Sequence, residues 1–484
     1  MIRWPAYPAA AAAALILNLH ASAAAAPEAL YRPLLIAIAA VAAVQLLATV
    51  VGRDRHQGAF LAALLVLAVI DVRASLGAVV VAGSVVALRI VRRRRDHPLP
   101  WARLTSGLNV FGLTLLALSI ASDLSGLVPT WRGSGPASEA PAGAPDIYLI
   151  LLDAYPRADT LAKDFGIDNE PFLTELGDLG FDVARKSTAN YNMTLLTLAS
   201  LLNHQPISDL PGIDPDRPAL DQYRDLARAL NHGRVIDELH AFGYETVSIP
   251  STFGQTALWA ADTVLDSGQL DAFEYTLFRH PPLRGLLPSL QRSWLVAQYR
   301  DRLMTTFDRL AELSSTGSDR PRFILAHLLA PHPPLVLGPD GEARDVWACY
   351  PNECEFWDSG WSSGVDVVVP AMRDQMAYVN RRLLDTVRTI QEMSDRPPII
   401  VVFSDHGYRH LPEDREETLR NLFAVYAPGQ PDLFPEDATP INLFPRLLNA
   451  YLHAGLDLEE ESSWWVDSST LDSRGILALE PVQP

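Results

Sequence analysis

Residues 397–407 read PPIIVVFSDHG, a short and almost wholly apolar run that ends in a carboxylate, Asp405, and an imidazole, His406. An apolar run of this length that is closed by polar residues predicts a strand buried on both faces, as in a parallel sheet. A carboxylate oxygen and an imidazole nitrogen together suit Zn²⁺ or Mn²⁺. Taken alone, an Asp-His-Gly turn can also be purely structural.

The same alternation of strand and helix recurs along residues 146–457. The stretches DIYLILLDAYP (146–156) and PRFILAHLLAPHPP (321–334) read as strands followed by polar residues. Such alternation predicts an α/β domain with a mostly parallel sheet covered by helices on both sides. Reactive groups in open α/β sheets lie past the carboxyl ends of the strands. We therefore expect Asp153, His332, Asp405 and His406 to meet at one edge of the sheet.

A second candidate feature is NYNMTLLTLASLLN, residues 190–203, which predicts a helix that begins near Thr194. At the N-terminus of a helix, backbone N–H groups and the helix dipole favour a bound phosphate, and a hydroxyl placed there faces it. The alternative is that Thr194 only caps the helix, a common role for threonine.

Residues 1–127 are dominated by Ala, Leu, Val and Ile. Apolar runs of about 20 residues match the length of a helix that crosses a bilayer. They predict about five transmembrane spans, near residues 6–25, 32–52, 58–72, 75–91 and 104–122. Two open questions are whether the first span is a cleaved secretory signal and whether the helices only anchor the chain or also present a lipid substrate.

Basic residues set the expected orientation of these spans. Arg53 and Arg55 follow the second span, and the run from Arg92 to Arg95 follows the fourth. Because cytoplasmic loops carry an excess of Lys and Arg, both groups are expected in the cytoplasm. The sequence therefore predicts a multi-pass protein of the bacterial inner (plasma) membrane whose domain after the fifth span is periplasmic.

The remaining segments are less specific. Residues 128–145 are rich in Pro, Gly and Ser and predict a flexible linker, and residues 458–484 predict an acidic C-terminal tail or a final hairpin on the sheet. The net charge of −18 argues against nucleic acid as a partner. Cys349 and Cys354 are expected to pair as a disulfide in an oxidising compartment, with two unpaired thiols as the alternative.

Five motifs in order, LILLDAY, NYNMTLLTLAS, HLLAPHPP, SDHG and INLFPRLLNAY, resemble the sulfatase-like branch of the alkaline phosphatase superfamily. Membrane helices followed by an extracytoplasmic domain resemble the lipoteichoic acid synthases and phosphoethanolamine transferases of that branch. The resemblance implies an alkaline phosphatase-like fold over roughly residues 146–455. It also implies that Thr194 is the nucleophile and that Asp153, Thr194, Asp405 and His406 hold a divalent metal ion.

The resemblance gives His332 a role in steadying the phosphate or protonating the leaving group. Arg157 is a further candidate for holding a phosphate oxygen, and His410 is a candidate at the edge of the site, although a structural role is the alternative for both. His327 is expected to pack in the core. Thr194 lacks the Pro and Arg that follow the nucleophile of formylglycine sulfatases, so a conventional sulfatase is not expected. Ala154 follows Asp153 where two-metal relatives carry a second acid, so one principal ion is expected.

The expected activity is that of a metal-dependent phosphotransferase. It would move a phosphoglycerol- or phosphoethanolamine-type head group from a membrane lipid or lipid-linked donor, through a phospho-threonine, to an envelope glycan or lipid acceptor. Zn²⁺ or Mn²⁺ is expected, with Mg²⁺ or Ca²⁺ as alternatives. A phosphodiesterase or sulfate-ester hydrolase of the same fold, and a non-catalytic binding protein, remain as alternatives.

Overall fold

The computed structural model describes residues 4–22, 27–52, 54–70, 101–127, 139–213, 219–271, 273, 274, 277, 288–344, 365–408, 415–466 and 479–482. The chain divides into two units. The first comprises Met1–Trp131 and Ala272–Pro288, and the second comprises Arg132–Asp271 and Ser289–Pro484. Each unit is described by itself.

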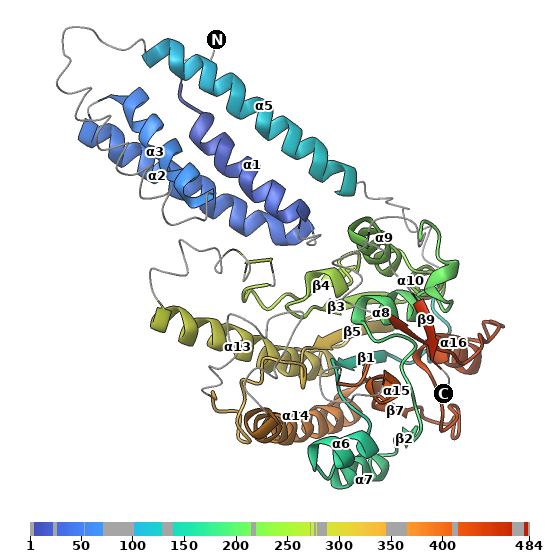
Figure 1. Ribbon diagram of the computed structural model, residues 1–484. Helices are drawn as coiled ribbons and strands as arrows, with labels where there is room; N and C mark the ends of the chain where they lie inside the picture. Colours follow the sequence, from blue (N-terminus) through green and yellow to red (C-terminus); the bar gives the residue numbers. More distant parts are fainter. Residues whose placement is uncertain are drawn as a thin grey trace, which may run out of the picture. The chain divides into compact units, whose positions relative to one another are not determined.

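The first unit is built from apolar helices (Figure 1), which are α1 (Tyr7–Ser22), η1 (Pro27–Leu30), α2 (Tyr31–Gly52), α3 (Arg55–Ile70) and α5 (Trp101–Leu127). Two stretches are long and apolar enough to cross a membrane, Tyr31–Val50 and Trp101–Ala121, and Tyr7–Ala21 is a shorter apolar helix. The predicted span at 75–91 lies outside the described residues. The apolar helical character of the N-terminal region is thus confirmed.

Polar side chains join α1 to α5. Asn109 Oδ1 accepts hydrogen bonds from the N–H groups of Ala6 and Tyr7, both at 3.0 Å, at the start of α1. Further along both helices, Asn18 Nδ2 donates to Ser119 Oγ at 2.9 Å. Because the early residues of α1 meet the early part of α5 and later residues meet later ones, α1 and α5 run parallel to each other.

The second unit contains a seven-stranded sheet in the order β2-β7-β6-β1-β5-β3-β4. The strand β1 pairs in parallel with β5 and with β6, whereas β7 is antiparallel to β6 and to β2. The strands are β1 (Ile147–Leu152), β2 (Asp182–Val183), β3 (Glu245–Ile249), β4 (Thr263–Val264), β5 (Arg322–Leu328), β6 (Ile399–Phe403) and β7 (Phe423–Tyr426). Every residue of β1, β5 and β6 is buried, as their apolar runs predict.

Helices cover both faces of this sheet (Figure 1), which confirms an α/β architecture. One face packs its alternate residues, such as Leu149, Leu151 and Phe403, into a core with α8 (Thr194–Leu201), α9 (Ala219–Asn231), α10 (Arg234–Ala241) and α16 (Leu443–Leu452). The long helices α13 (Pro288–Ser315) and α14 (Val365–Met393) lie on the opposite face. Shorter helices are α6 (Ala158–Phe165), α7 (Glu170–Asp178), η2 (Ile207–Asp209), η3 (Gly254–Thr256), α15 (Arg415–Leu419) and η5 (Pro440–Asn442).

The C-terminal stretch forms a second, two-stranded antiparallel sheet from β8 (Ser463–Val466) and β9 (Leu479–Val482). Tyr191, three residues before Thr194, forms an isolated parallel bridge with Trp464 of β8. Residues 458–484 thus include ordered structure that contacts the segment leading into α8. Of the predicted linker at 128–145, residues 128–138 lie outside the described part of the chain.

Candidate metal centre and nucleophile

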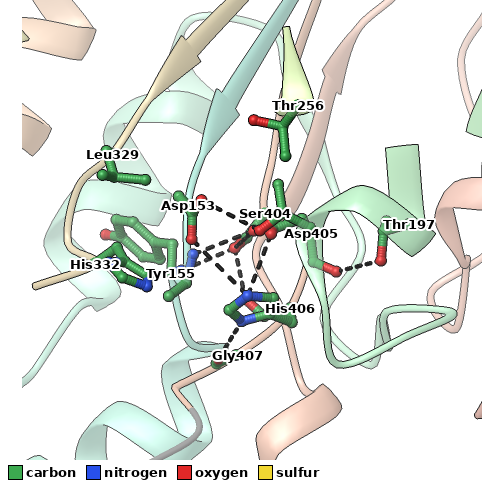
Figure 2. Close-up of polar contacts among 12 residues, drawn as sticks. Asp153, Tyr155, Thr197, Thr256, Leu329, His332, Ser404, Asp405, His406 and Gly407 are labelled. Atoms are coloured by element: carbon green, nitrogen blue, oxygen red, sulfur yellow. Dashed lines mark hydrogen bonds and ion pairs between the residues drawn. The ribbon is translucent and has the colours of Figure 1, made fainter. Parts of the chain in front are cut away.

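Adjacent strands bring three candidate ligands together. Asp153 follows the last residue of β1, and Asp405 and His406 follow β6 at the same end of the sheet, where Leu151 is in register with Phe403. Their ligand atoms lie within 4.8 Å of one another. His406 Nε2 is 3.2 Å from Asp405 Oδ2 and 3.8 Å from Asp153 Oδ1 (Figure 2). This is the meeting point that the strand ends predict.

The polar atoms of this cluster fit a bound cation. Asp153 Oδ1, Asp405 Oδ2 and His406 Nε2 are buried and have no hydrogen-bond partner among the described residues. Two buried carboxylates with unpartnered oxygens are costly unless a positive charge compensates them. The Nδ1–H of His406 donates to the Gly407 carbonyl at 2.6 Å, which leaves the Nε2 lone pair for a metal. Two carboxylates and an imidazole form a donor set suited to Zn²⁺ or Mn²⁺.

Thr194 stands beside these ligands as the first residue of α8. The N-cap residue of α8, Met193, makes no side-chain capping bond. The hydroxyl of Thr194 is directed to Asp153 Oδ2 at 3.4 Å. The second threonine of the helix, Thr197, donates to the Asp405 carbonyl at 3.0 Å and so ties α8 to the loop after β6 (Figure 2).

His327 is part of the site, although its place in an apolar strand predicts a core role. It is buried and is in register with Leu151 of β1, so its side chain lies on the same face as Asp153. His327 Nε2 lies 2.9 Å from Asp153 Oδ2, and its Nδ1 lies 3.2 Å from Thr256 Oγ1. The available sequence signal was a histidine next to the carboxyl end of a strand, five residues before His332.

The charge state of Asp153 follows from these neighbours. Burial by itself raises the pKa of the Asp153 carboxyl. Electrostatic interaction with His332, His327 and His406, together with the hydrogen bond from His327, outweighs burial and holds that pKa well below its ordinary value. Asp153 is therefore a carboxylate, the form that can ligate a metal.

His332 also reaches the site from the loop after β5. Its backbone N–H donates to the Asp153 carbonyl at 3.0 Å, and its ring contacts Phe253 edge-on with centroids 5.5 Å apart. Its Nδ1 lies 2.6 Å from the Pro333 carbonyl. That contact fixes the ring with Nε2 as the other nitrogen through which it can exchange a proton.

The other predicted residues are placed differently. The Arg157 guanidinium holds both oxygens of Asp159 at 2.7 and 2.8 Å and donates to the Ser187 carbonyl at 3.0 Å. Burial raises the pKa of Asp159, but the bond and the charge from Arg157 outweigh it, and the net pKa is lowered. Arg157 thus acts in this structure as an ion-pair partner. His410, Cys349 and Cys354 lie outside the described residues.

The fold and the site together define a class of protein, an α/β chain that carries a candidate metal centre beside a hydroxyl at a helix N-terminus. No family model and no curated protein matches the sequence. Among solved structures, the chain is similar to the integral membrane lipooligosaccharide phosphoethanolamine transferase A from Neisseria meningitidis. The identity is 14% and the TM-score 0.42, over 78% of this chain and 68% of that one.

Two further structures are similar at comparable levels. The C-terminal periplasmic domain of EptC from Escherichia coli, in complex with Zn, has 10% identity and a TM-score of 0.39 over 66% of this chain and 84% of that one. The 2-O GAG sulfatase BT1596 has 15% identity and a TM-score of 0.39 over 68% and 74%. At these identities the likeness concerns the fold alone, and it is distant.

Proposed function

We propose that this chain is a membrane-anchored, metal-dependent phosphotransferase of the sulfatase-like branch of the alkaline phosphatase superfamily. It moves a phosphoryl head group of the phosphoglycerol or phosphoethanolamine type from a membrane lipid or lipid-linked donor to an envelope glycan or lipid. The observation that carries the proposal is the convergence of three buried, unpartnered ligand atoms beside the Thr194 hydroxyl. A turn with a purely structural role is not expected to leave three buried polar atoms without hydrogen-bond partners.

Asp153, Asp405, His406 and the Thr194 oxygen would hold one divalent ion, Zn²⁺ or Mn²⁺, with Mg²⁺ or Ca²⁺ as alternatives. Such an ion supplies Lewis acidity, which lowers the pKa of a bound hydroxyl and withdraws charge from a phosphoryl oxygen. Thr194, with its hydroxyl proton released to water beforehand, attacks the phosphorus of the donor, and a phospho-threonine forms as the bond to the lipid alcohol breaks. The acceptor hydroxyl then displaces Thr194.

Two groups of the chain assist this exchange. Backbone N–H groups in the first turn of α8 would donate to the phosphoryl oxygens of a bound donor. His332 gives a proton to the departing lipid alkoxide, which leaves as a neutral alcohol, and takes one from the acceptor hydroxyl in the second half-reaction. Arg157 would have to break its ion pair with Asp159 before it could contact a phosphate oxygen. We propose His410 as a second contact at the edge of the site. We also propose a disulfide between Cys349 and Cys354.

We infer five membrane crossings and a periplasmic catalytic domain. The helices α2 and α3 are separated by two residues, and Gly58 of α3 lies close to Thr49 of α2, as expected of a hairpin. If α1 runs outward, α3 also ends outside. The start of α5 must lie inside because α5 is parallel to α1. The chain therefore crosses once more between Ile70 and Trp101, where the apolar residues 75–91 lie.

Two described residues that follow the sheet strand β4 in the sequence, Phe273 and Glu274, support the same orientation. Both belong to the first unit and contact its apolar helices. Phe273 packs edge-on against His20 with ring centroids 5.3 Å apart, and Glu274 forms an ion pair with Arg32. His20 lies near the end of α1 and Arg32 at the start of α2, which is the predicted outer end of both helices.

The proposal is tested with the full-length protein loaded with zinc and mixed with vesicles of phosphatidylethanolamine or phosphatidylglycerol. Transfer of the head group releases diacylglycerol, and release is expected from at least one vesicle type. The Asp405→Asn variant keeps the shape of the side chain but loses its charge, and it should release none. Head group found free in solution would identify a hydrolase. Preferential cleavage of an aryl sulfate, with no diacylglycerol, would contradict the proposal.

A further inference from the structure

The four residues before the proposed nucleophile, Asn190 to Met193, do not belong to a helix. Met193 is in an extended conformation and makes no side-chain capping bond at the start of α8. The position of the Thr194 hydroxyl, 3.4 Å from Asp153 Oδ2, therefore depends on what fixes this short segment.

Asn190 is one fixing point. Its side-chain amide donates to the Ser462 carbonyl at 2.8 Å and to Thr439 Oγ1 at 2.9 Å, and its Oδ1 accepts the Ile441 N–H at 2.8 Å. The Asn190 carbonyl also accepts the Trp464 N–H at 2.8 Å. Asn190 is 1% exposed, so these bonds form away from bulk water.

Asn192 is the second fixing point. Its Nδ2 donates to the Val466 carbonyl, and its Oδ1 accepts the Val466 N–H, both at 2.9 Å. A side-chain amide thus pairs with a backbone amide in both directions, as a neighbouring strand would. Asn192 is 2% exposed and Val466 is fully buried. The two residues are 274 positions apart in the sequence.

Thr197 links the same segment to the loop that carries two of the candidate metal ligands. Its Oγ1 lies 3.2 Å from the Tyr191 carbonyl and 3.0 Å from the Asp405 carbonyl. The segment before Thr194 is therefore bonded to the C-terminal strand directly and to the loop that carries Asp405 through Thr197.

We propose that residues Ser462–Val466, here called the C-terminal clasp, act through Asn190 and Asn192 to position the Thr194 hydroxyl at the metal ligands. Asn192 is a positioning residue, since both polar atoms of its side chain are bonded to the backbone of Val466. This role deepens the proposed function and rests on it. A displacement of about 1 Å at a nucleophile can lower turnover on the order of 100-fold, so a clasp at this place controls rate.

The test compares Asn192→Ala with a matched control in the zinc-loaded full-length protein. Asn449 makes the same two-way pair with Leu456, at 2.8 and 2.7 Å, away from the nucleophile. The two variants thus lose the same two-way pair of hydrogen bonds, which is buried at Asn192 and half-buried at Asn449. Three quantities are measured: hydrogen exchange in the peptide over residues 188–198, zinc affinity, and kcat and KM for diacylglycerol release from phosphatidylethanolamine or phosphatidylglycerol vesicles.

For Asn192→Ala we expect faster exchange in that peptide and zinc affinity lowered about 10-fold or more, in the range seen when groups that orient ligands are removed. We also expect kcat lowered by about 10- to 100-fold with KM for the lipid little changed. For Asn449→Ala we expect none of these changes. If Asn192→Ala does not fold, Asn192→Ser replaces it, because it loses the two-way pair with Val466 but keeps a small, neutral polar side chain.

Failure of the clasp and failure of the proposed function give different results. If the wild type releases no diacylglycerol, the proposed function fails, and exchange and zinc affinity still decide the clasp. Unchanged exchange and zinc affinity in the Asn192 variant would overturn it. Faster exchange with unchanged kcat and zinc affinity would also overturn it, because the contact would then only stabilise the fold.

Discussion

Asp153 uses its two carboxylate oxygens differently. Oδ2 is held by His327 at 2.9 Å, whereas Oδ1 is buried without a partner among the described residues and faces His406 Nε2 at 3.8 Å. A bond to one oxygen fixes the rotation of the carboxylate and so aims the other. His327 therefore fixes the orientation of a candidate metal ligand. In known metal sites the reverse arrangement is common, in which a carboxylate orients a metal-bound histidine.

The role of His327 can be tested by His327→Ala. We expect metal affinity to fall by about 10- to 100-fold, because Asp153 is no longer held in its ligating orientation. Competition with a chelator of known affinity measures this. His240→Ala is the control, since His240 of α10 also lies 3.1 Å from a carboxylate, but that carboxylate, Asp262, precedes the edge strand β4, which is separated from β1 by β5 and β3. Equal losses in both variants would show that His327 has no special role.

The close packing around Gly407, the glycine of the SDHG motif, leaves no room for a side chain. A Cβ atom on Gly407 would lie 2.5 Å from the Arg420 carbonyl oxygen and 2.9 Å from that of Thr418, both in a backbone that cannot move aside easily. Because Gly407 also accepts the hydrogen bond from His406 Nδ1, a shift here would turn the imidazole.

Gly407→Ala is thus expected to destabilise the protein by about 1–3 kcal/mol, as overpacking does, and to weaken metal binding. Gly177→Ala is the matched control, because Gly177 lies in α7 with nothing within 4 Å of its added Cβ. That change should stabilise the protein by about 0.5–1 kcal/mol, since alanine is the better helix former. Thermal unfolding of both variants distinguishes the two effects, and a neutral Gly407→Ala would refute the close-packing argument.

Among the helices and strands, those that are buried on both faces are the ones that the sequence predicts best. The strands β1, β5 and β6 are predictable because each is an apolar run buried on both faces. Strands of two residues, such as β2 and β4, carry too little pattern to be recognised. The helix α8 is recognisable from its leucines, and the strand ends predict that Asp153, Asp405 and His406 lie close together, as they do.

The sequence does not show which elements, far apart along the chain, contact each other. His327 has the alternation of a core residue, and only its register with Leu151 reveals that it lies beside Asp153. Asn190 bonds to Ser462, just before β8, and Asn192 bonds to Val466 in β8. The partners in each pair are more than 270 positions apart, and the C-terminal partners lie in an acidic stretch that carries no motif. Pairing register and long-range closure are tertiary properties, so neither could be derived from local pattern.

At the scale of the whole molecule, the parallel arrangement of α1 and α5 makes a prediction about membrane sides. In a chain with Cys349 and Cys354 replaced by serine, Glu139→Cys and Arg55→Cys are labelled in intact cells with a membrane-impermeant thiol reagent. Labelling is expected at position 139 and absent at position 55, because five crossings place them on opposite sides. Equal behaviour at the two positions would mean that residues 75–91 do not cross.

The central claim is that Thr194 accepts the head group, and mass analysis of the zinc-loaded full-length protein after brief exposure to glycerophospholipid vesicles tests it most directly. We predict an adduct of the phosphoryl head group on the peptide that contains Thr194, present in wild type and in Thr194→Ser, which keeps a hydroxyl. Thr194→Ala should lack the adduct and lose turnover by at least roughly 10³-fold. An adduct on another residue, or unimpaired turnover in the Ala variant, would contradict the account.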